Sequence, residues 1–158
     1  MFTVDWLLNT WVKAPYLKNT NIVVASACLT KVNPGILEEF SKNKVVLLAC
    51  PEQEGFAHCS KIAAIIRCSC PRSITVVTME GSPHCYTLHA IVSEAVFLTG
   101  SNIKRKHFVV VNGLTLKEIS VEAVRLARYL HLVDELLKTH PEVLKELKKL
   151  SLEQKLSK

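Results

Sequence analysis

The stretch that decides the fold reads SITVVTMEGSPHCY and covers residues 73–86. β-branched residues dominate its first half, which predicts a buried strand, and Gly81-Ser82-Pro83 then predicts a tight loop and a helix start. Ser82 is suited to cap that helix and Pro83 to occupy its first turn, so Cys85 is expected at the junction. The unpaired N–H groups of a helix start would favour an ionised thiol at this position.

Two other segments repeat this design. Residues 21–28 read NIVVASAC and residues 44–51 read KVVLLACP, so each apolar run has a cysteine at its downstream end. Because the carboxyl ends of parallel strands meet at one edge of a sheet, we expect Cys28, Cys50 and Cys85 to converge. Thiolates bind zinc and iron–sulfur clusters, so these three cysteines predict a metal or iron–sulfur site.

Two histidines lie close to Cys85 in the sequence. His84 is adjacent to it and would complete a set of three thiolates and one nitrogen, or would simply face water. His89 follows Cys85 by four residues, on the same side of the expected helix, as a ligand, a partner of a ligand or a packing residue. The remaining cysteines, Cys59, Cys68 and Cys70, are interpreted as surface or packing residues.

The order of the expected elements defines the fold class. A first helix is expected within residues 2–16, and the remaining elements alternate as strands 21–28, 44–49, 73–79 and 107–111 with helices 35–42, 52–68, 86–98, 116–139 and 142–150. This alternation predicts an α/β protein, a three-layer α/β/α sandwich with a mostly parallel sheet of about four strands. We expect one domain over residues 1–150, with its last helices in 116–150, and a frayed tail over 151–158.

Composition narrows the class of protein. The chain has 158 residues, of which 49% are hydrophobic and 22% charged, as in a globular domain. It has neither an apolar run of about 20 residues nor a basic, cleavable leader, so we expect no membrane span and a cytoplasmic location. In a reducing compartment the six cysteines are expected to be ligands, reactive thiols or buried residues instead of disulfides.

The charge is basic but dispersed. The net charge is +6 and the isoelectric point is near 9.1, yet the cations are scattered and alternate with acids near the end of the chain. This pattern is typical of a solvated face and argues against nucleic-acid binding. The same region carries an apolar stripe that would serve either as core or as an interaction surface, leaving self-association open: Leu136, Leu137, Val143, Leu144, Leu147 and Leu150.

Three of these motifs together resemble a known family. Ser26-Ala27-Cys28, the run KVVLLACP and the run SITVV followed by Met79-Glu80 and Pro83-His84-Cys85 are similar to the C-terminal domain of archaeal and bacterial 4Fe–4S ferredoxin-type, iron–sulfur-binding proteins. The resemblance covers about half the chain, without the family's N-terminal ferredoxin module. It implies an iron–sulfur or metal role for Cys28, Cys50 and Cys85. His84 replaces the first of two adjacent cysteines in the family and the loop is one residue longer, which would raise a cluster's potential or select zinc.

Four functions follow from these observations. The first is an iron–sulfur protein for electron transfer or redox sensing, which would need a redox partner protein. The second is a zinc site, structural or hydrolytic. The third is a metal-free thiol oxidoreductase in which Cys85 reacts and Cys28 or Cys50 resolves the disulfide. The fourth is an interaction module without catalysis, so the sequence leaves open whether the protein is an enzyme.

Overall fold

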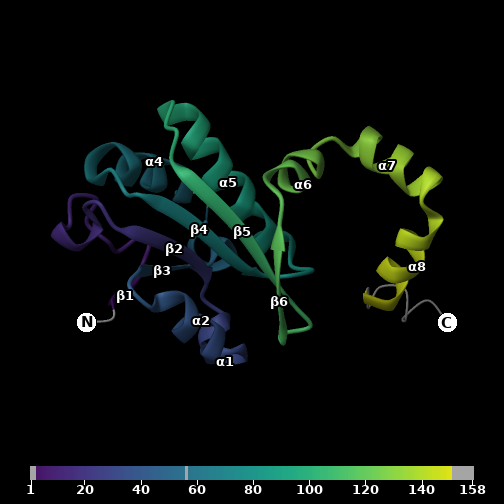
Figure 1. Ribbon diagram of the computed structural model, residues 1–158, viewed down its shortest axis with the longest axis horizontal. Helices are drawn as coiled ribbons and strands as arrows, with labels where there is room; N and C mark the ends of the chain where they lie inside the picture. The colour runs from purple at the N-terminus through teal and green to yellow at the C-terminus, as the bar shows by residue number, and fades with distance from the viewer. Residues whose placement is uncertain (1–2, 56, 151–158) are drawn as a thin grey trace. The chain divides into compact units, whose positions relative to one another are not determined.

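A computed structural model of the protein describes residues 3–55 and 57–150. The chain divides into two compact units between Ser120 and Val121. The first unit contains the sheet, and the second contains the last three helices (Figure 1). The tail over residues 151–158, expected from the sequence to fray, lies outside the described residues.

The first unit is built on a six-stranded sheet with the order β1-β3-β2-β4-β5-β6 (Figure 1). Its strands are β1 (Thr3–Trp6), β2 (Asn21–Ser26), β3 (Val45–Ala49), β4 (Ser73–Met79), β5 (Lys104–Val111) and β6 (Thr115–Ile119). All neighbours from β1 to β5 run parallel, and β6 runs antiparallel to β5. The α/β class with a mostly parallel sheet is therefore confirmed, with six strands where about four were expected.

The central strands are apolar on both faces because helices cover both faces. All five residues of β3 are buried, and so are five of the six residues of β2. Val23 and Ala25 of β2 belong to one buried cluster, and Ile22 and Val24 to another on the opposite face. Strands covered in this way lose the alternation of apolar and polar residues, which is why the sequence shows continuous apolar runs.

The helices of the first unit are α1 (Leu29–Val32), α2 (Pro34–Ser41), α3 (Pro51–Glu54), α4 (His58–Ser69) and α5 (Pro83–Thr99), with a 3-10 turn η1 (Pro15–Leu17). Side chains of α2 pack on one face of the sheet, and side chains of α4 and α5 pack on the other. The single helix predicted over residues 52–68 is two helices, because Gly55 interrupts it with a φ of 76°. That left-handed conformation cannot continue an α-helix.

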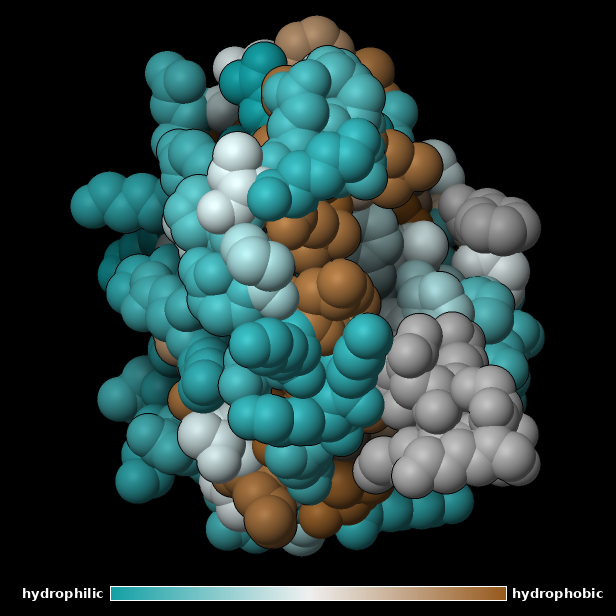
Figure 2. Space-filling model, turned by 90° about the vertical axis from the view of Figure 1, so that its right-hand side faces the viewer, coloured by the Kyte–Doolittle hydropathy of each residue, from teal (hydrophilic) through white to brown (hydrophobic). Residues whose placement is uncertain are grey.

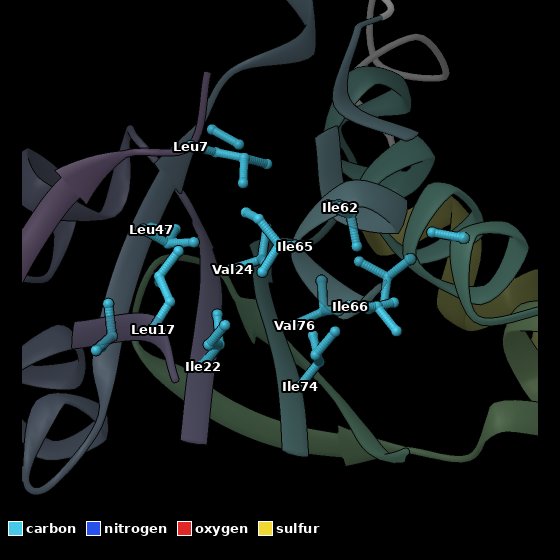
Figure 3. Close-up of a cluster of buried hydrophobic side chains, with 14 of the residues drawn as sticks. Leu7, Leu17, Ile22, Val24, Leu47, Ile62, Ile65, Ile66, Ile74 and Val76 are labelled. Atoms are coloured by element: carbon cyan, nitrogen blue, oxygen red, sulfur yellow. The ribbon is translucent and has the colours of Figure 1, made fainter. Parts of the chain in front are cut away.

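The larger buried cluster joins α4 and α5 to the sheet. Figure 3 shows Ile62, Ile65 and Ile66 of α4 directed toward strand residues such as Val24 and Val76. The three isoleucines recur at helical spacing, so they form one stripe that the sheet covers. This packing fixes α4 and α5 on one face of the sheet, and with them the start of α5 that carries Cys85.

The helix predicted within residues 2–16 is wrong. The segment forms β1, turns and η1, and the backbone N–H of Leu7 continues the ladder by donating to Leu48 O at 2.8 Å. Helical spacing of Trp6, Leu7 and Trp11 suggested an amphipathic helix, yet Leu7 is fully buried and Trp11 is 65% exposed. Pairing with the otherwise open edge of β3 outweighs the local preference, because an edge leaves a row of backbone groups unpaired.

The helix predicted over residues 116–139 is wrong in its first part. Asn112 and Gly113 have φ of 52° and 73°, and this turn sends the chain back as β6 along β5. Asn-Gly is a strong hairpin signal, and it outweighs the three-residue spacing of Leu116 and Ile119 that suggested a helix. Leu116 packs instead on the cluster beneath α2.

Gly113 offers a first prediction. Gly113→Ala is expected to lower the free energy of unfolding by about 1–2 kcal/mol, because an L-residue is strained in the left-handed region. The added Cβ would also lie only 2.9 Å from Val32 Cγ1. The control is Gly35→Ala within α2, whose Cβ would meet Asn33 Oδ1 at 3.6 Å. It should change stability by no more than about 1 kcal/mol, in the stabilising direction. Urea unfolding of both variants would measure the difference in stability. Equal losses of stability in the two variants would contradict the left-handed conformation of Gly113.

The second unit consists of α6 (Val121–Leu126), α7 (Leu130–Thr139) and α8 (Pro141–Leu150). Val124 is buried, whereas neither α7 nor α8 has a buried residue. The helix expected over 142–150 is therefore present as α8, whereas the helix expected over 116–139 exists only in part, with a break at residues 127–129. Over the whole described part of the chain, every helix is too short or too polar to cross a membrane.

Candidate functional site

The sheet has a switch point between β2 and β4. From β2 the chain moves to β3 on one side, and from β4 it moves to β5 on the other side. Open α/β sheets bind ligands outside the carboxyl ends of the strands at such a point, because the connecting loops separate there. The segments that follow β2 and β4 therefore border the candidate site.

The three cysteines follow three neighbouring parallel strands, as expected. Cys28 comes two residues after β2, Cys50 comes directly after β3, and Cys85 lies in the first turn of α5, which follows β4. Their side chains differ in exposure, because Cys28 is exposed, Cys50 is partly buried and Cys85 is buried. All three are free thiols.

Cys85 is positioned by the capped start of α5. Its backbone N–H donates to Ser82 Oγ at 3.3 Å, and Pro83 occupies the first helical position. Gly81, with a φ of 84°, makes the turn from β4 into this cap. The local sequence predicts this arrangement, since a serine cap followed by proline is a typical helix start.

A buried hydrogen bond links the two sides of the switch point. Ser26, the last residue of β2, donates its hydroxyl to Cys85 Sγ at 3.2 Å. Ser26 is 1% exposed and Cys85 is 9% exposed, so water competes little for this bond. A hydroxyl donor stabilises a sulfur anion more than a neutral thiol. Sequence reasoning missed Ser26, and the available signal was a hydroxyl residue at the end of an otherwise apolar strand.

The segment after β3 forms a second polar cluster. The Cys50 backbone N–H donates to Glu54 Oε2 at 2.8 Å, and His58 Nε2 lies 2.9 Å from the same oxygen. His58 is fully buried, and its Nδ1 has no hydrogen-bond partner among the described residues. Glu54 thus joins the start of α3 to the start of α4 beside Cys50.

His84 lies at the surface. Its side chain is 49% exposed, and its Nδ1 lies 3.6 Å from Glu52 Oε2, which is itself 71% exposed. This contact is an ion pair only when the imidazole is protonated. The structure thus gives His84 a carboxylate neighbour at the surface, which agrees with the reading in which it faces water.

The donor set does not fit an assembled metal centre. Within residues 3–55 and 57–150, no group of three or more histidine, cysteine, aspartate or glutamate side chains is arranged to hold a metal ion. A zinc or iron–sulfur site requires several ligands at bonding distance of one centre. The ligand roles expected for Cys28, Cys50, Cys85 and His84 therefore stay a prediction.

His89 is a packing residue in a buried polar chain. Its Nε2 lies 2.8 Å from Thr78 Oγ1, and its Nδ1 lies 2.9 Å from Nδ1 of His107 on β5. Burial, and after it His107, lowers the pKa of His89 to about 3. Burial, and after it the charge of Arg105, lowers the pKa of His107 to about 4. Both rings are thus neutral near pH 7, and one Nδ1 donates to the other.

The remaining cysteines lie elsewhere. Cys59 is on α4, where burial and then the nearby Glu94 raise the pKa of its thiol. Cys68 and Cys70 are exposed at the end of α4, close to the start of β4. They therefore lie at the amino ends of the parallel strands, whereas Cys85 lies at the carboxyl ends. A hollow of about 370 Å³ at the amino ends is lined by Cys70 together with Arg67 and Ser101. The interpretation of these three as surface or packing residues agrees with their positions.

The sheet order defines a class of protein. The core order β3-β2-β4-β5, wound outward in both directions with helices on both faces, is that of a doubly wound α/β protein. The chain belongs to the Rossmann-like domain family, which matches residues 14–158.

One relative is similar over most of its length. A protein of Archaeoglobus fulgidus, described as an uncharacterized protein, is 30% identical over an alignment of 126 residues that covers 75% of this chain and 89% of that protein. No solved structure matches the chain. Neither the family description nor the relative's name states an activity. The iron–sulfur role implied by the resemblance to ferredoxin-type proteins stays a prediction.

Proposed function

We propose that the protein is a thiol redox protein in which Cys85 is the reactive residue. The observation that carries the proposal is the buried hydrogen bond from Ser26 to Cys85 Sγ at the switch point of the sheet. The start of α5 adds the partial positive charge of the helix dipole, because Cys85 lies in the first turn of this helix. Both features lie at the place where doubly wound sheets bind their ligands.

The proposed reaction is thiol–disulfide exchange with a disulfide of a partner protein. The Cys85 thiolate attacks one sulfur of the substrate disulfide, forming a mixed disulfide and releasing the other sulfur as a thiolate. Cys28, which follows the neighbouring strand β2, or Cys50, which follows β3 one strand further away, then attacks Cys85 Sγ and releases the second substrate thiolate. The substrate gains two electrons and the protein loses two as it forms an internal disulfide. A dithiol reductant returns it to the reduced form, which presupposes a reducing, cytoplasmic compartment.

Alkylation tests the Ser26 contact. Removing a hydrogen bond to a charged group costs about 1.5–3 kcal/mol, so Ser26→Ala should slow alkylation of Cys85 at neutral pH by roughly tenfold or more. Rates would be followed by mass spectrometry of iodoacetamide-labelled peptides, with the exposed Cys68 as an internal reference. Ser60→Ala is the control, since its hydroxyl donates to Ala57 O on the exposed side of α4. An unchanged Cys85 rate in Ser26→Ala would contradict the proposal.

Oxidation tests the resolving thiol. Treatment with a disulfide-forming oxidant should link Cys85 to Cys28 or Cys50 within one chain, and peptide mapping would identify the pair. Cys85→Ser should abolish this disulfide. A chain whose only oxidation products are disulfides between molecules would rule out the exchange mechanism.

Metal binding is the second candidate, favoured by one observation. Cys28, Cys50 and Cys85 follow three adjacent parallel strands, so all three belong to the same end of the sheet. Metal analysis of anaerobically purified protein distinguishes the candidates. Iron with sulfide would support a cluster, stoichiometric zinc would support a zinc site, and metal-free protein with reactive Cys85 would support the thiol proposal.

A further inference from the structure

We infer that Cys68 and Cys70 form a second thiol site, which binds one Cu(I) ion at the end of α4. Both are free, exposed thiols, and one residue separates them. Exposed apolar side chains are ordinary on a protein surface, and Figure 2 shows brown ones between the teal hydrophilic side chains of one face. Free cysteine, in contrast, is among the residues most often buried. Two exposed thiols so close together therefore call for an explanation of their own. The inference is independent of the chemistry proposed for Cys85.

The residue between the two thiols holds them on the solvent side. Ser69 is 2% exposed, and its hydroxyl donates to Val12 O at 2.6 Å. Its carbonyl oxygen accepts from the backbone N–H of Asn19 at 3.2 Å. Two hydrogen bonds thus fix this residue with its side chain inside the protein, while both of its neighbours are exposed. The pair of thiols therefore rests on a firmly held segment, as a binding site requires.

The backbone of Cys70 turns its thiol back toward Cys68. Cys70 ends α4 in the left-handed conformation, with a φ of 47° and a ψ of 56°. Its Sγ lies 3.9 Å from Arg67 O, the carbonyl oxygen of the peptide bond between Arg67 and Cys68. In a regular helix, residues two apart lie about 200° apart around the axis, on nearly opposite sides. Because metal–sulfur bonds are about 2.3 Å long, two sulfurs on one ion stand about 4–5 Å apart. Rotation of the Cys68 side chain about its Cα–Cβ bond is the movement that would complete the site.

The number and type of ligands favour Cu(I). Within residues 3–55 and 57–150, no third histidine, cysteine or carboxylate joins the pair in a group that could hold a metal ion. Zinc sites in proteins use three or four protein ligands. Cu(I) is a softer ion that prefers sulfur, and two thiolates in a linear arrangement satisfy it. A pair of thiols on its own therefore fits Cu(I) better than zinc.

The surroundings suit the complex that would form. The two thiols lose their protons as one Cu(I) ion binds, so the ion with its two sulfurs carries one negative charge. Arg67 directly precedes Cys68 in the last turn of α4 and supplies a positive charge in this region. Arg67 and Cys70 also line the hollow of about 370 Å³ described above. A small Cu(I) donor thus has access to the sulfur of Cys70 from solvent.

Anaerobic titration of the whole, fully reduced chain with Cu(I), in competition with a chromogenic Cu(I) chelator, tests the inference. One tightly bound ion per chain is expected. Cys68→Ser and Cys70→Ser should each weaken its binding by roughly hundredfold or more, because even the loss of a group that only supports a ligand costs about 10–100-fold. Cys59→Ser is the matched control, since it removes a thiol from the other end of the same helix and should leave the affinity unchanged. Circular dichroism would show whether each variant keeps its fold.

X-ray absorption spectroscopy of the copper-loaded chain identifies the ligands, and two sulfur neighbours around copper are expected. Three or more sulfur neighbours, or tight copper binding that both serine variants keep, would place the ion at other cysteines and overturn the inference. So would one ion for every two chains, because each chain would then supply a single thiol. A chain that binds no Cu(I), or that binds zinc more tightly than Cu(I), would contradict it as well.

Discussion

Acidification from about pH 7 to about pH 4.5 is expected to lower the free energy of unfolding by about 5 kcal/mol through two buried histidines. His89 and His107 lie 2.9 Å apart through their Nδ1 atoms, and their exposed fractions are 2% and 0%. Protonating either ring would place a cation in an apolar layer beside the other ring and near Arg105. His107 Nε2 has no hydrogen-bond partner among the described residues, so that layer offers its proton no acceptor.

The direction of this change in stability follows from the pKa values of the two histidines in the folded and in the unfolded chain. In the folded protein the pKa of His89 is about 3 and that of His107 about 4, against 6.5 for an unperturbed histidine. The unfolded chain therefore binds protons more readily as the pH falls below about 6.5. The contribution of the two histidines to the free energy of unfolding is fully present above that pH. It is lost as the pH falls toward their folded-state pKa values, at roughly 1.4 kcal/mol per pH unit for each ring.

Urea unfolding at several pH values would measure this loss. His89→Gln with His107→Gln should remove most of the pH dependence between about pH 6.5 and about pH 4.5. His131→Gln with His140→Gln replaces two exposed histidines instead and should leave the dependence unchanged. If the first double variant does not fold, NMR of the unaltered protein gives a second measurement. Imidazole signals of His89 that titrate near 6.5 would contradict the prediction.

Leu88→Ala is expected to lower the free energy of unfolding by about 2–5 kcal/mol. Leu88 is fully buried in the cluster between α5 and the sheet. Removing its side chain beyond Cβ loses the transfer energy of one methine and two methyl groups and leaves a cavity in a close-packed layer. The change lies one turn from Cys85, so the alkylation rate of Cys85 would report whether the start of α5 moves.

Phe97→Ala is the matched control on the same helix. Phe97 is 81% exposed, so its replacement should change stability by no more than about 0.5 kcal/mol. Chemical denaturation of the two variants separates burial from helix propensity, because both substitutions introduce alanine into α5. Similar losses in the two variants would show that the packing of α5 is not as described.

Strands were predictable from the sequence where their own residues favour a strand. β2, β3 and β4 are apolar and β-branched along their length, because both faces are covered, and such runs form strands in almost any context. β1 and β6 are edge strands that exist through pairing with β3 and β5. Their own residues fit helical spacing, so pattern alone placed them in helices, although Asn112-Gly113 signals a hairpin before β6.

Only the part of the candidate site whose residues are close together in the sequence was predictable. A serine cap and a proline three and two residues before Cys85 define the helix start, and all of these lie in one short stretch. The Ser26 contact joins residues 59 positions apart, and the histidine pair joins residues 18 positions apart. Such pairs depend on strand order and on how each helix lies on the sheet, which spacing along the chain does not encode. Strand order was therefore the missing step between the cysteine pattern and its chemistry.

The place of β2 in the sheet has a consequence for synthesis of the protein. β2 lies in the middle, and both of its neighbours, β3 and β4, come later in the chain. As the nascent polypeptide leaves the ribosome, this apolar strand has no partner until Ala49 has emerged and only one until Met79 follows. Residues 21–26 are thus the segment that a chaperone would need to shield during translation, because unpaired apolar strands are prone to aggregation.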